Sequence, residues 1–330
     1  MIFVSYHGGA HGSYLEFVCN YVLANVQVRS NRPFDTDGTA HAKQYISKPI
    51  FETRHYSNDS KSPHLLKNSK IIHIEVTHDD LLPITGISFL RANGIKIDLD
   101  TLEKDTFNKL NKPIIRADVL DVLLEKYFSN HVLIEGYNTV KAEDWPDITN
   151  FNDFQNLPDW IKNECIDIHK FTYQELNETT PDCPRYILRE FFKIGFKYPE
   201  QHGWMKYQNL VKHDPSNDIF SFPFGAFYDT EKFVQQIDAI GKWSGFSINN
   251  YSNLLELHED FLKLQPYKNS KLYCDNIINR IRNREEFELG NLHLLYESYI
   301  SAKLELIFDI TLPFEMPAWF KHSKEIMKYI

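Results

Sequence analysis

Two patterns of apolar positions along this chain predict β-strands: short apolar runs, and the alternation of polar and apolar residues. Short runs rich in β-branched and aromatic residues predict buried strands at 2–4 and 70–76. Residues 218–222 alternate polar and apolar side chains, which predicts a half-buried strand. The short apolar run at 132–134 fits a strand or the end of a helix.

Helical periodicity dominates the segments between these strands. The first helix is expected at about 13–28, directly after the first strand. Further amphipathic helices are predicted at 81–90, 101–110, 117–128, 184–196, 230–243 and 252–264. Because strands separated by helices form parallel sheets, the pattern predicts an α/β fold with a mainly parallel central sheet flanked by helices.

The length of 330 residues allows one large domain or two smaller ones. We expect a single α/β domain over 1–330, with 250–330 as its helical C-terminal portion. Residues 140–165 are acidic and interrupted by prolines, which predicts a loop or hinge.

The stretch 2–18 is the most informative part of the chain, because a strand, a glycine-rich turn and a helix follow one another there. Gly8, Gly9 and Gly12 lie within five residues, and Ser13 opens the helical pattern. Glycine allows the backbone to approach a ligand closely, and a helix start offers unpaired amides and a positive dipole end. These features predict a phosphate- or sulfate-binding loop. The alternative is a structural turn, because neither the Walker nor the dinucleotide glycine pattern is met.

Residues 7–15, HGGAHGSYL, resemble the sulfonate-donor loop of the sulfotransferase family, which also joins the first strand to the first helix. Residues 218–224 and 227–233 are similar to that family's late strand-to-helix passage. The resemblance implies a divergent member with a P-loop-type three-layer fold. It also implies transfer of a sulfuryl group from 3′-phosphoadenylyl sulfate (PAPS) to a hydroxyl or amine of a small-molecule, glycan or peptide acceptor.

The resemblance places the donor on the loop and leaves charge to be supplied from elsewhere. His7 and His11 are the catalytic candidates, each as a base or, when protonated, as an electrostatic stabiliser; a hydrogen bond to the loop backbone is the alternative. We prefer His11, which adjoins Gly12 in the part of the loop that would surround the transferred group. The residues expected to bind the donor are Gly8, Gly9, Ala10, Gly12, Ser13, Tyr14, Arg189 and Arg91.

The sequence departs from the family pattern in its charges. Ala10 or His11 stands where the family loop carries a lysine, and Asp79 and Asp80 follow the second strand where the family has an arginine. A bound dianion there needs a counter-charge, and guanidinium groups suit phosphate. The arginine candidates, in order, are Arg189 and Arg91, followed by Arg116 and Arg185.

Each of these assignments has a structural alternative. Arg189 can instead form an ion pair within its amphipathic helix. Asp79 and Asp80 can form a carboxylate pair for acid–base chemistry or cap the next helix. The aromatic residues between Phe220 and Tyr228 can form core packing or an acceptor-binding wall.

Composition limits the classes of function. The net charge of −9 argues against general nucleic-acid binding. No apolar run approaches the roughly 20 residues of a membrane span, and the N-terminus has no signal-peptide pattern. The four cysteines have no metal-ligand spacing, so we expect a soluble, cytoplasmic, reduced protein without a metal cofactor. The sequence leaves its oligomeric state open.

Two other functions remain open. A P-loop phosphotransferase would share the strand–turn–helix arrangement, but the chain lacks the lysine and the Mg²⁺-binding carboxylate pattern of that class. A non-catalytic binding or assembly module, for example a viral structural protein, would retain the fold and lose the loop lysine.

Overall fold

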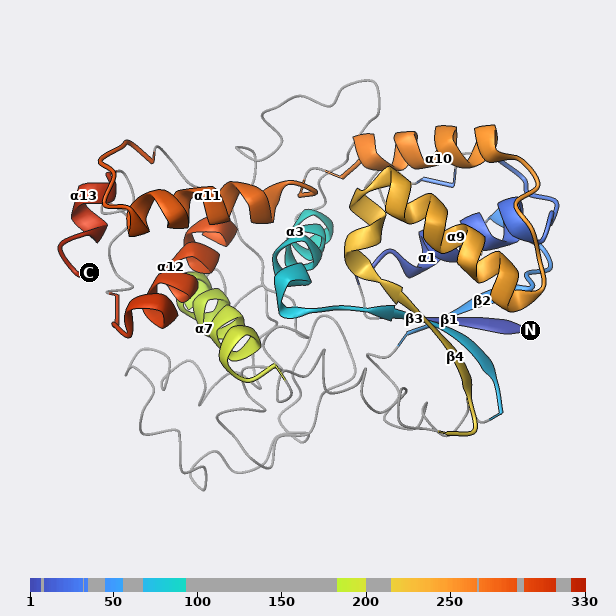
Figure 1. The fold of residues 1–330 in the computed structure, drawn as a ribbon, viewed down its shortest axis with the longest axis horizontal. Coiled ribbons are helices and arrows are strands. Elements are labelled where there is room, and N and C mark those ends of the chain that lie inside the picture. The colour runs from blue at the N-terminus through green and yellow to red at the C-terminus, as the bar shows by residue number, and fades with distance from the viewer. Residues whose placement is uncertain are drawn as a thin grey trace. The chain divides into compact units, whose positions relative to one another are not determined.

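The computed structural model describes residues 1–6, 9–31, 33–34, 45–55, 68–92, 183–199, 215–265, 267–289, 294–312 and 322–330. These residues belong to two compact units, called unit 1 and unit 2 below (Figure 1). Unit 1 contains the described residues up to Asp80 and those at 215–268. Unit 2 contains those at 81–92, at 183–199 and from Asn269 onward. Among the described residues, each unit is therefore assembled from parts of the chain that are far apart in sequence.

Unit 1 is built on a parallel sheet, as the sequence predicts. Its described strands are β1 (Ile2–Tyr6), β2 (Phe51–His55), β3 (Lys70–Glu75) and β4 (Asp218–Pro223). They are hydrogen-bonded in the order β2-β1-β3-β4, and every pair is parallel. The α/β class and the predicted strands at 2–4, 70–76 and 218–222 are confirmed, whereas β2 is a strand that we did not predict.

Helices pack against this sheet within unit 1 (Figure 1). The first, α1 (Gly12–Val18), contacts β1 and β2 and continues into the π-helical η1 (Cys19–Leu23). Helix α9 (Thr230–Ser244) packs on β4, and α10 (Tyr251–Lys263) packs on α9. The first helix was predicted to end at about residue 28, which is too far. In the structure the helical segment ends at Leu23, and Asn25 adopts a positive φ of 52°.

The helix α1–η1 holds the edge strand β2 through two buried polar side chains. Oδ1 of Asn20 accepts hydrogen bonds from the amides of Ile50 at 2.7 Å and Phe51 at 3.1 Å. Its Nδ2 donates to the Phe51 carbonyl at 2.8 Å. One turn earlier, Oε2 of Glu16 accepts the amide of Thr53 at 3.2 Å. Backbone groups at the sheet edge are thus satisfied by a helix.

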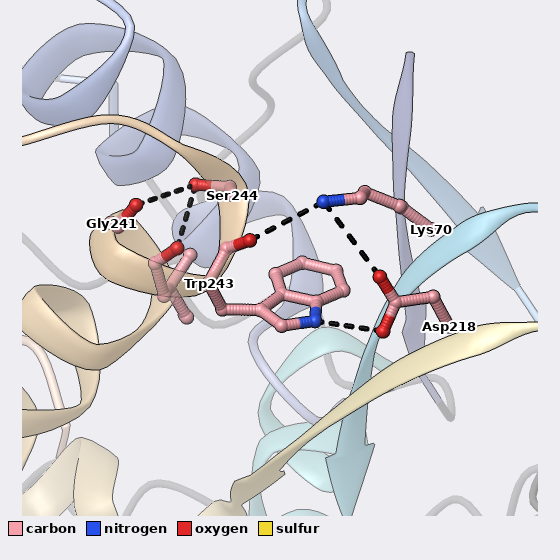
Figure 2. Close-up of polar contacts among 6 residues, drawn as sticks. Lys70, Asp218, Gly241, Trp243 and Ser244 are labelled. Carbon is pink, nitrogen blue, oxygen red and sulfur yellow. Dashed lines mark hydrogen bonds and ion pairs between the residues drawn. The ribbon is translucent and has the colours of Figure 1, made fainter.

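The amino ends of β3 and β4 are fastened to the end of α9, as Figure 2 shows. Nζ of Lys70 lies 3.7 Å from Oδ2 of Asp218 and donates to the Trp243 carbonyl at 3.3 Å. Nε1 of Trp243 donates to Oδ1 of Asp218 at 2.9 Å. A cation beside the last carbonyls of a helix is favourable, so these contacts stabilise the end of α9 at this edge of the sheet.

Unit 2 is helical in its described parts. Its helices are α3 (Leu81–Ala92), α7 (Cys183–Lys197), α11 (Ser270–Arg282), α12 (Leu294–Phe308) and α13 (Ser323–Ile326). Helix α12 packs against α7, α11 and α3. The predicted helices at 81–90 and 184–196 are confirmed, whereas those at 101–110 and 117–128, the run at 132–134 and the hinge at 140–165 lie outside the described residues. Among the described helices, none has the length and apolar character needed to cross a membrane. The single domain stays a prediction.

Candidate functional site

The order of the strands identifies one crevice at the carboxyl edge of the sheet. From β1 the chain moves outward to β2 and then crosses to β3 on the other side of β1. The chain continues from β1 to β2 on one side and from β3 to β4 on the other side, so the carboxyl ends of β1 and β3 form the switch point of the sheet. Ligands of doubly wound sheets bind at such switch points. The glycine turn after β1 and residues 76–80 after β3 border this crevice.

The turn after β1 has an unusual backbone. Gly9 has φ of 88°, Ala10 is fully buried, and His11 has φ of 57°. Positive φ strains residues other than glycine, although histidine tolerates it better than most. His7 and Gly8 lie outside the described residues, so their predicted roles stay predictions.

Gly12 begins α1 directly beneath the ring of Tyr6. A Cβ built on Gly12 would lie 2.1 Å from Cδ1 of Tyr6, which is a steric clash. The Tyr6 hydroxyl lies 3.3 Å from Oγ of Ser13, in the next residue of the helix. Packing alone therefore requires glycine at position 12, and the turn has a structural reason for this glycine.

The His11 side chain enters an aromatic cluster whose described members belong to unit 1. Its ring stacks on Phe224 with centroids 5.5 Å apart and meets the ring of Phe261 edge-on at 4.9 Å. Nε2 lies 2.9 Å from the hydroxyl of Tyr228, which belongs to the short helix η9 (Phe224–Tyr228) after β4. This contact brings the glycine turn and the turn after β4 together.

The surroundings of His11 favour its neutral form. Burial lowers its pKa to about 3, because the aromatic rings replace the water that would hydrate the charged ring. The pKa of Tyr228 is raised well above 10, first by burial and then by the carboxylate of Asp80. At neutral pH the pair is an uncharged imidazole and an uncharged phenol. This environment disfavours the predicted imidazolium, while a role for the neutral ring stays a prediction.

Tyr14 connects the start of α1 to the same cluster. Its ring stacks on Phe261 with centroids 4.1 Å apart, and its hydroxyl lies 3.3 Å from Nδ1 of His258. His258, in α10, is a buried member of the site region for which we predicted no role. The aromatic residues Phe222, Phe224 and Phe227 are also fully buried, which supports core packing rather than an acceptor wall.

The end of β3 is organised by Thr77 and Asp80. Oδ2 of Asp80 accepts from the amide and from the hydroxyl of Thr77, each at 2.8 Å. Burial raises the pKa of Asp80, and the hydrogen bonds from Thr77 oppose that shift. Asp79 lies instead beside His78, with 3.6 Å between Oδ1 and Nε2. The two carboxylates therefore have different partners, and that of Asp80 closes the turn before α3.

The preferred arginine forms a buried ion pair in unit 2. Nη1 of Arg189, in α7, lies 3.4 Å from Oε1 of Glu305 and donates to the Leu312 carbonyl at 2.9 Å. Lys193 lies 2.9 Å from the other carboxylate oxygen. Of the two alternatives for Arg189, the structure contains the ion pair; a role toward the donor stays a prediction. Arg116 and the side chains of Arg91 and Arg185 lie outside the described residues.

A small pocket in unit 1 lies between η1 and α10. Its lining consists of Tyr21, Asn31, Asn253, Glu256, Leu257 and Asp260. Its volume is about 20 Å³, room for about one water molecule. It is thus much smaller than a nucleotide. A search for metal sites finds no group of three or more His, Cys, Asp or Glu side chains among the described residues.

Comparison of the chain with protein-family models, curated proteins and solved structures finds no match.

Proposed function

We propose that this protein is a sulfotransferase-like enzyme that binds PAPS in the crevice between the carboxyl ends of β1 and β3. One observation carries the proposal: the loop that resembles a sulfonate-donor loop borders the switch point of the sheet. The proposal is thus supported by the resemblance of the loop and by the position of its preceding strand at the switch point.

Backbone groups are the main contacts that the loop offers to the donor. The first amides of any helix lack partners within it, and α1 begins directly after the turn. Helical structure continues from Gly12 to Leu23 through η1, so the dipole of the whole segment favours an anion at its start. The hydroxyl of Ser13 adds a side-chain donor in the first turn.

The missing element is positive charge. With His11 neutral, residues 9–15 contain no cationic side chain at neutral pH. The expected counter-charge must therefore come from residues beyond this segment, with Arg91 and Arg189 as the candidates. The acceptor, a hydroxyl or an amine, is not identified by these features.

The neutral loop also favours a second candidate function. A non-catalytic binding or assembly module needs the strand–turn–helix frame but no charge at the transferred group. Such a module would be compatible with an uncharged His11–Tyr228 pair and with the ion pair between Arg189 and Glu305. A phosphotransferase has no comparable observation in its favour.

Ligand-dependent thermal unfolding of the full chain separates these functions. A ligand present at 100 times its Kd stabilises the folded protein by about 2.7 kcal/mol. PAPS and its desulfated product 3′-phosphoadenosine 5′-phosphate (PAP) should raise Tm, whereas ATP with Mg²⁺ should have a smaller effect. A larger rise with Mg²⁺–ATP would favour the phosphotransferase, and no rise with any nucleotide would favour the non-catalytic module.

Two serine variants test whether PAP binds at the loop. Ser13→Ala removes a loop hydroxyl and should reduce the PAP-induced rise, because a hydrogen bond to a charged ligand is lost. Ser252→Ala, an equal change at an exposed position of α10, should leave the rise intact. Equal responses to PAP in both variants would remove Ser13 from the proposed site.

A further inference from the structure

The backbone strain at His11 is the first of two independent observations. His11 has φ of 57°, although glycine would adopt this conformation without strain and neighbouring positions 9 and 12 are glycine. A strained residue persists only where its surroundings hold it, and such residues cluster at functional sites. Here the surroundings are the rings of Phe224 and Phe261, which fix the plane of the imidazole.

The anchoring of one ring nitrogen is the second observation. Nε2 of His11 is engaged by the Tyr228 hydroxyl at 2.9 Å, while His11 as a residue stays partly exposed. Among the described residues, Nδ1 is therefore the ring nitrogen left to meet a ligand. In functional histidines the hydrogen bond at one ring nitrogen determines whether the other nitrogen carries a proton.

Tyr228 is suited to hold the ring because its own charge state is fixed. The phenol keeps its proton, since burial and the nearby Asp80 carboxylate both disfavour phenolate. It belongs to η9, between β4 and α9, so the turn after β4 places its hydroxyl against the turn after β1. The two turns border the same carboxyl edge.

We propose that Tyr228 is a positioning residue, whose hydroxyl fixes the orientation and tautomer of a neutral His11 so that Nδ1 is presented to the ligand at the switch point. The inference rests on the proposed function for the identity of that ligand. The neutral ring supplies one directional hydrogen bond and no charge. The counter-charge for a phosphosulfate is left to other residues.

Nitrogen-15 NMR of the histidine rings in the full chain tests the first part. In the wild type, His11 should show one dominant neutral tautomer. Tyr228→Phe should shift its Nε2 resonance and mix the tautomers, with His258 unchanged. Tyr14→Phe is the matched control, because it removes the hydroxyl that faces His258 and should change only that ring. Identical His11 resonances in wild type and Tyr228→Phe would overturn the inference.

Titration with PAP tests the second part. Tyr228→Phe should weaken PAP binding about tenfold, the effect of one lost hydrogen bond of ordinary strength. Tyr251→Phe, at an exposed position of α10, should bind PAP as the wild type does. Equal PAP affinity in wild type and Tyr228→Phe would overturn the positioning role. If the wild type binds neither PAP nor PAPS, the proposed donor is wrong, while the tautomer measurement still decides whether Tyr228 holds His11.

His11→Asn provides a second test of the positioning role, in combination with Tyr228→Phe. Asparagine tolerates positive φ and lacks the ring. Since Tyr228 is proposed to act through His11, adding Tyr228→Phe to His11→Asn should weaken PAP binding no further. A double variant that loses the sum of the two single effects would show that Tyr228 acts independently, which contradicts the inference.

Discussion

The hydroxyl of Tyr14 lies 3.3 Å from Nδ1 of His258, a contact that joins the first turn of α1 to α10 across 244 positions of the chain. The His258 ring also stacks on Phe233, with centroids 4.1 Å apart. Burial lowers the pKa of His258 to about 4, a shift that Asp229 partly opposes. Together with His11, unit 1 therefore contains two histidines that fold in the neutral form.

Unit 1 should lose stability in mild acid because of these histidines. Their folded-state pKa values, about 3 for His11 and about 4 for His258, lie below the ordinary 6.5, so the unfolded chain takes up protons first. Their contribution is complete above pH 6.5 and is lost as the pH falls toward those values. The loss at pH 5 should be roughly 2 kcal/mol for each histidine. Urea unfolding between pH 7.5 and 4.5 measures it.

A histidine variant separates this effect from general acid denaturation. His258→Gln should make the pH dependence shallower, because one titrating group is removed. A wild-type stability that stays constant from pH 7 to pH 5 would contradict the neutral cluster.

Gly12→Ala should destabilise the protein by about 1–3 kcal/mol through overpacking. The new Cβ would meet the Tyr6 ring, 2.1 Å away in the present structure. Tyr6→Ala creates a cavity of its own, but in that background the cost of Gly12→Ala should nearly vanish. A double-mutant cycle by urea unfolding measures the coupling. Additive effects would show that the Tyr6 ring is not the obstacle.

Asn20→Ala should destabilise unit 1 by about 2–3 kcal/mol, because a buried amide that satisfies three backbone groups of β2 and its approach is lost. Amide hydrogen exchange should be faster at Ile50 and Phe51, whose N–H groups lose their acceptor. Asn253→Ala is the comparison, since this half-buried asparagine makes a hydrogen bond to the Tyr21 hydroxyl at 3.2 Å. Equal costs for the two variants would argue against Asn20 as the holder of β2.

Glu305→Gln should destabilise unit 2 by about 3–5 kcal/mol, the usual cost of removing one partner of a buried ion pair. The change leaves Arg189 buried with the Leu312 carbonyl as its remaining hydrogen-bond acceptor among those described above, and Lys193 loses its carboxylate. Glu259→Gln, at an exposed position of α10, should cost less than about 1 kcal/mol. Chemical unfolding of both variants gives the comparison.

The strands that could be predicted are those whose own residues are apolar. β1 (IFVSY) and β3 (KIIHIE) consist mainly of apolar residues and lie in the middle of the sheet, so their pattern is local and clear. β2 reads FETRH and lies at the sheet edge, where Asn20 and Glu16 satisfy it from another part of the chain. Its stability as a strand is thus not encoded in its own five residues.

The location of the site could be predicted from the sequence, but its side-chain contacts and charge state could not. Parallel topology alone brings the glycine turn and the turn after β4 to the same edge of the sheet. The ring of His11 meets Tyr228 across 217 positions, and such pairing depends on tertiary packing rather than on local pattern. The neutral state of His11 likewise follows from rings contributed by η9 and α10. The sequence of the loop alone therefore could not show that this histidine is uncharged.

The pairing of β3 with β4 has a consequence for biosynthesis. Paired residues of the two strands are 148 positions apart, because the chain visits unit 2 between them. At ribosomal rates of about 5–20 residues per second, β4 emerges roughly 7–30 s after β3. During that interval one edge of the apolar strand β3 has no β4 to cover it, and an uncovered apolar edge is a template for aggregation. A nascent chain of this protein therefore has a defined period in which a chaperone bound near β3 would protect it.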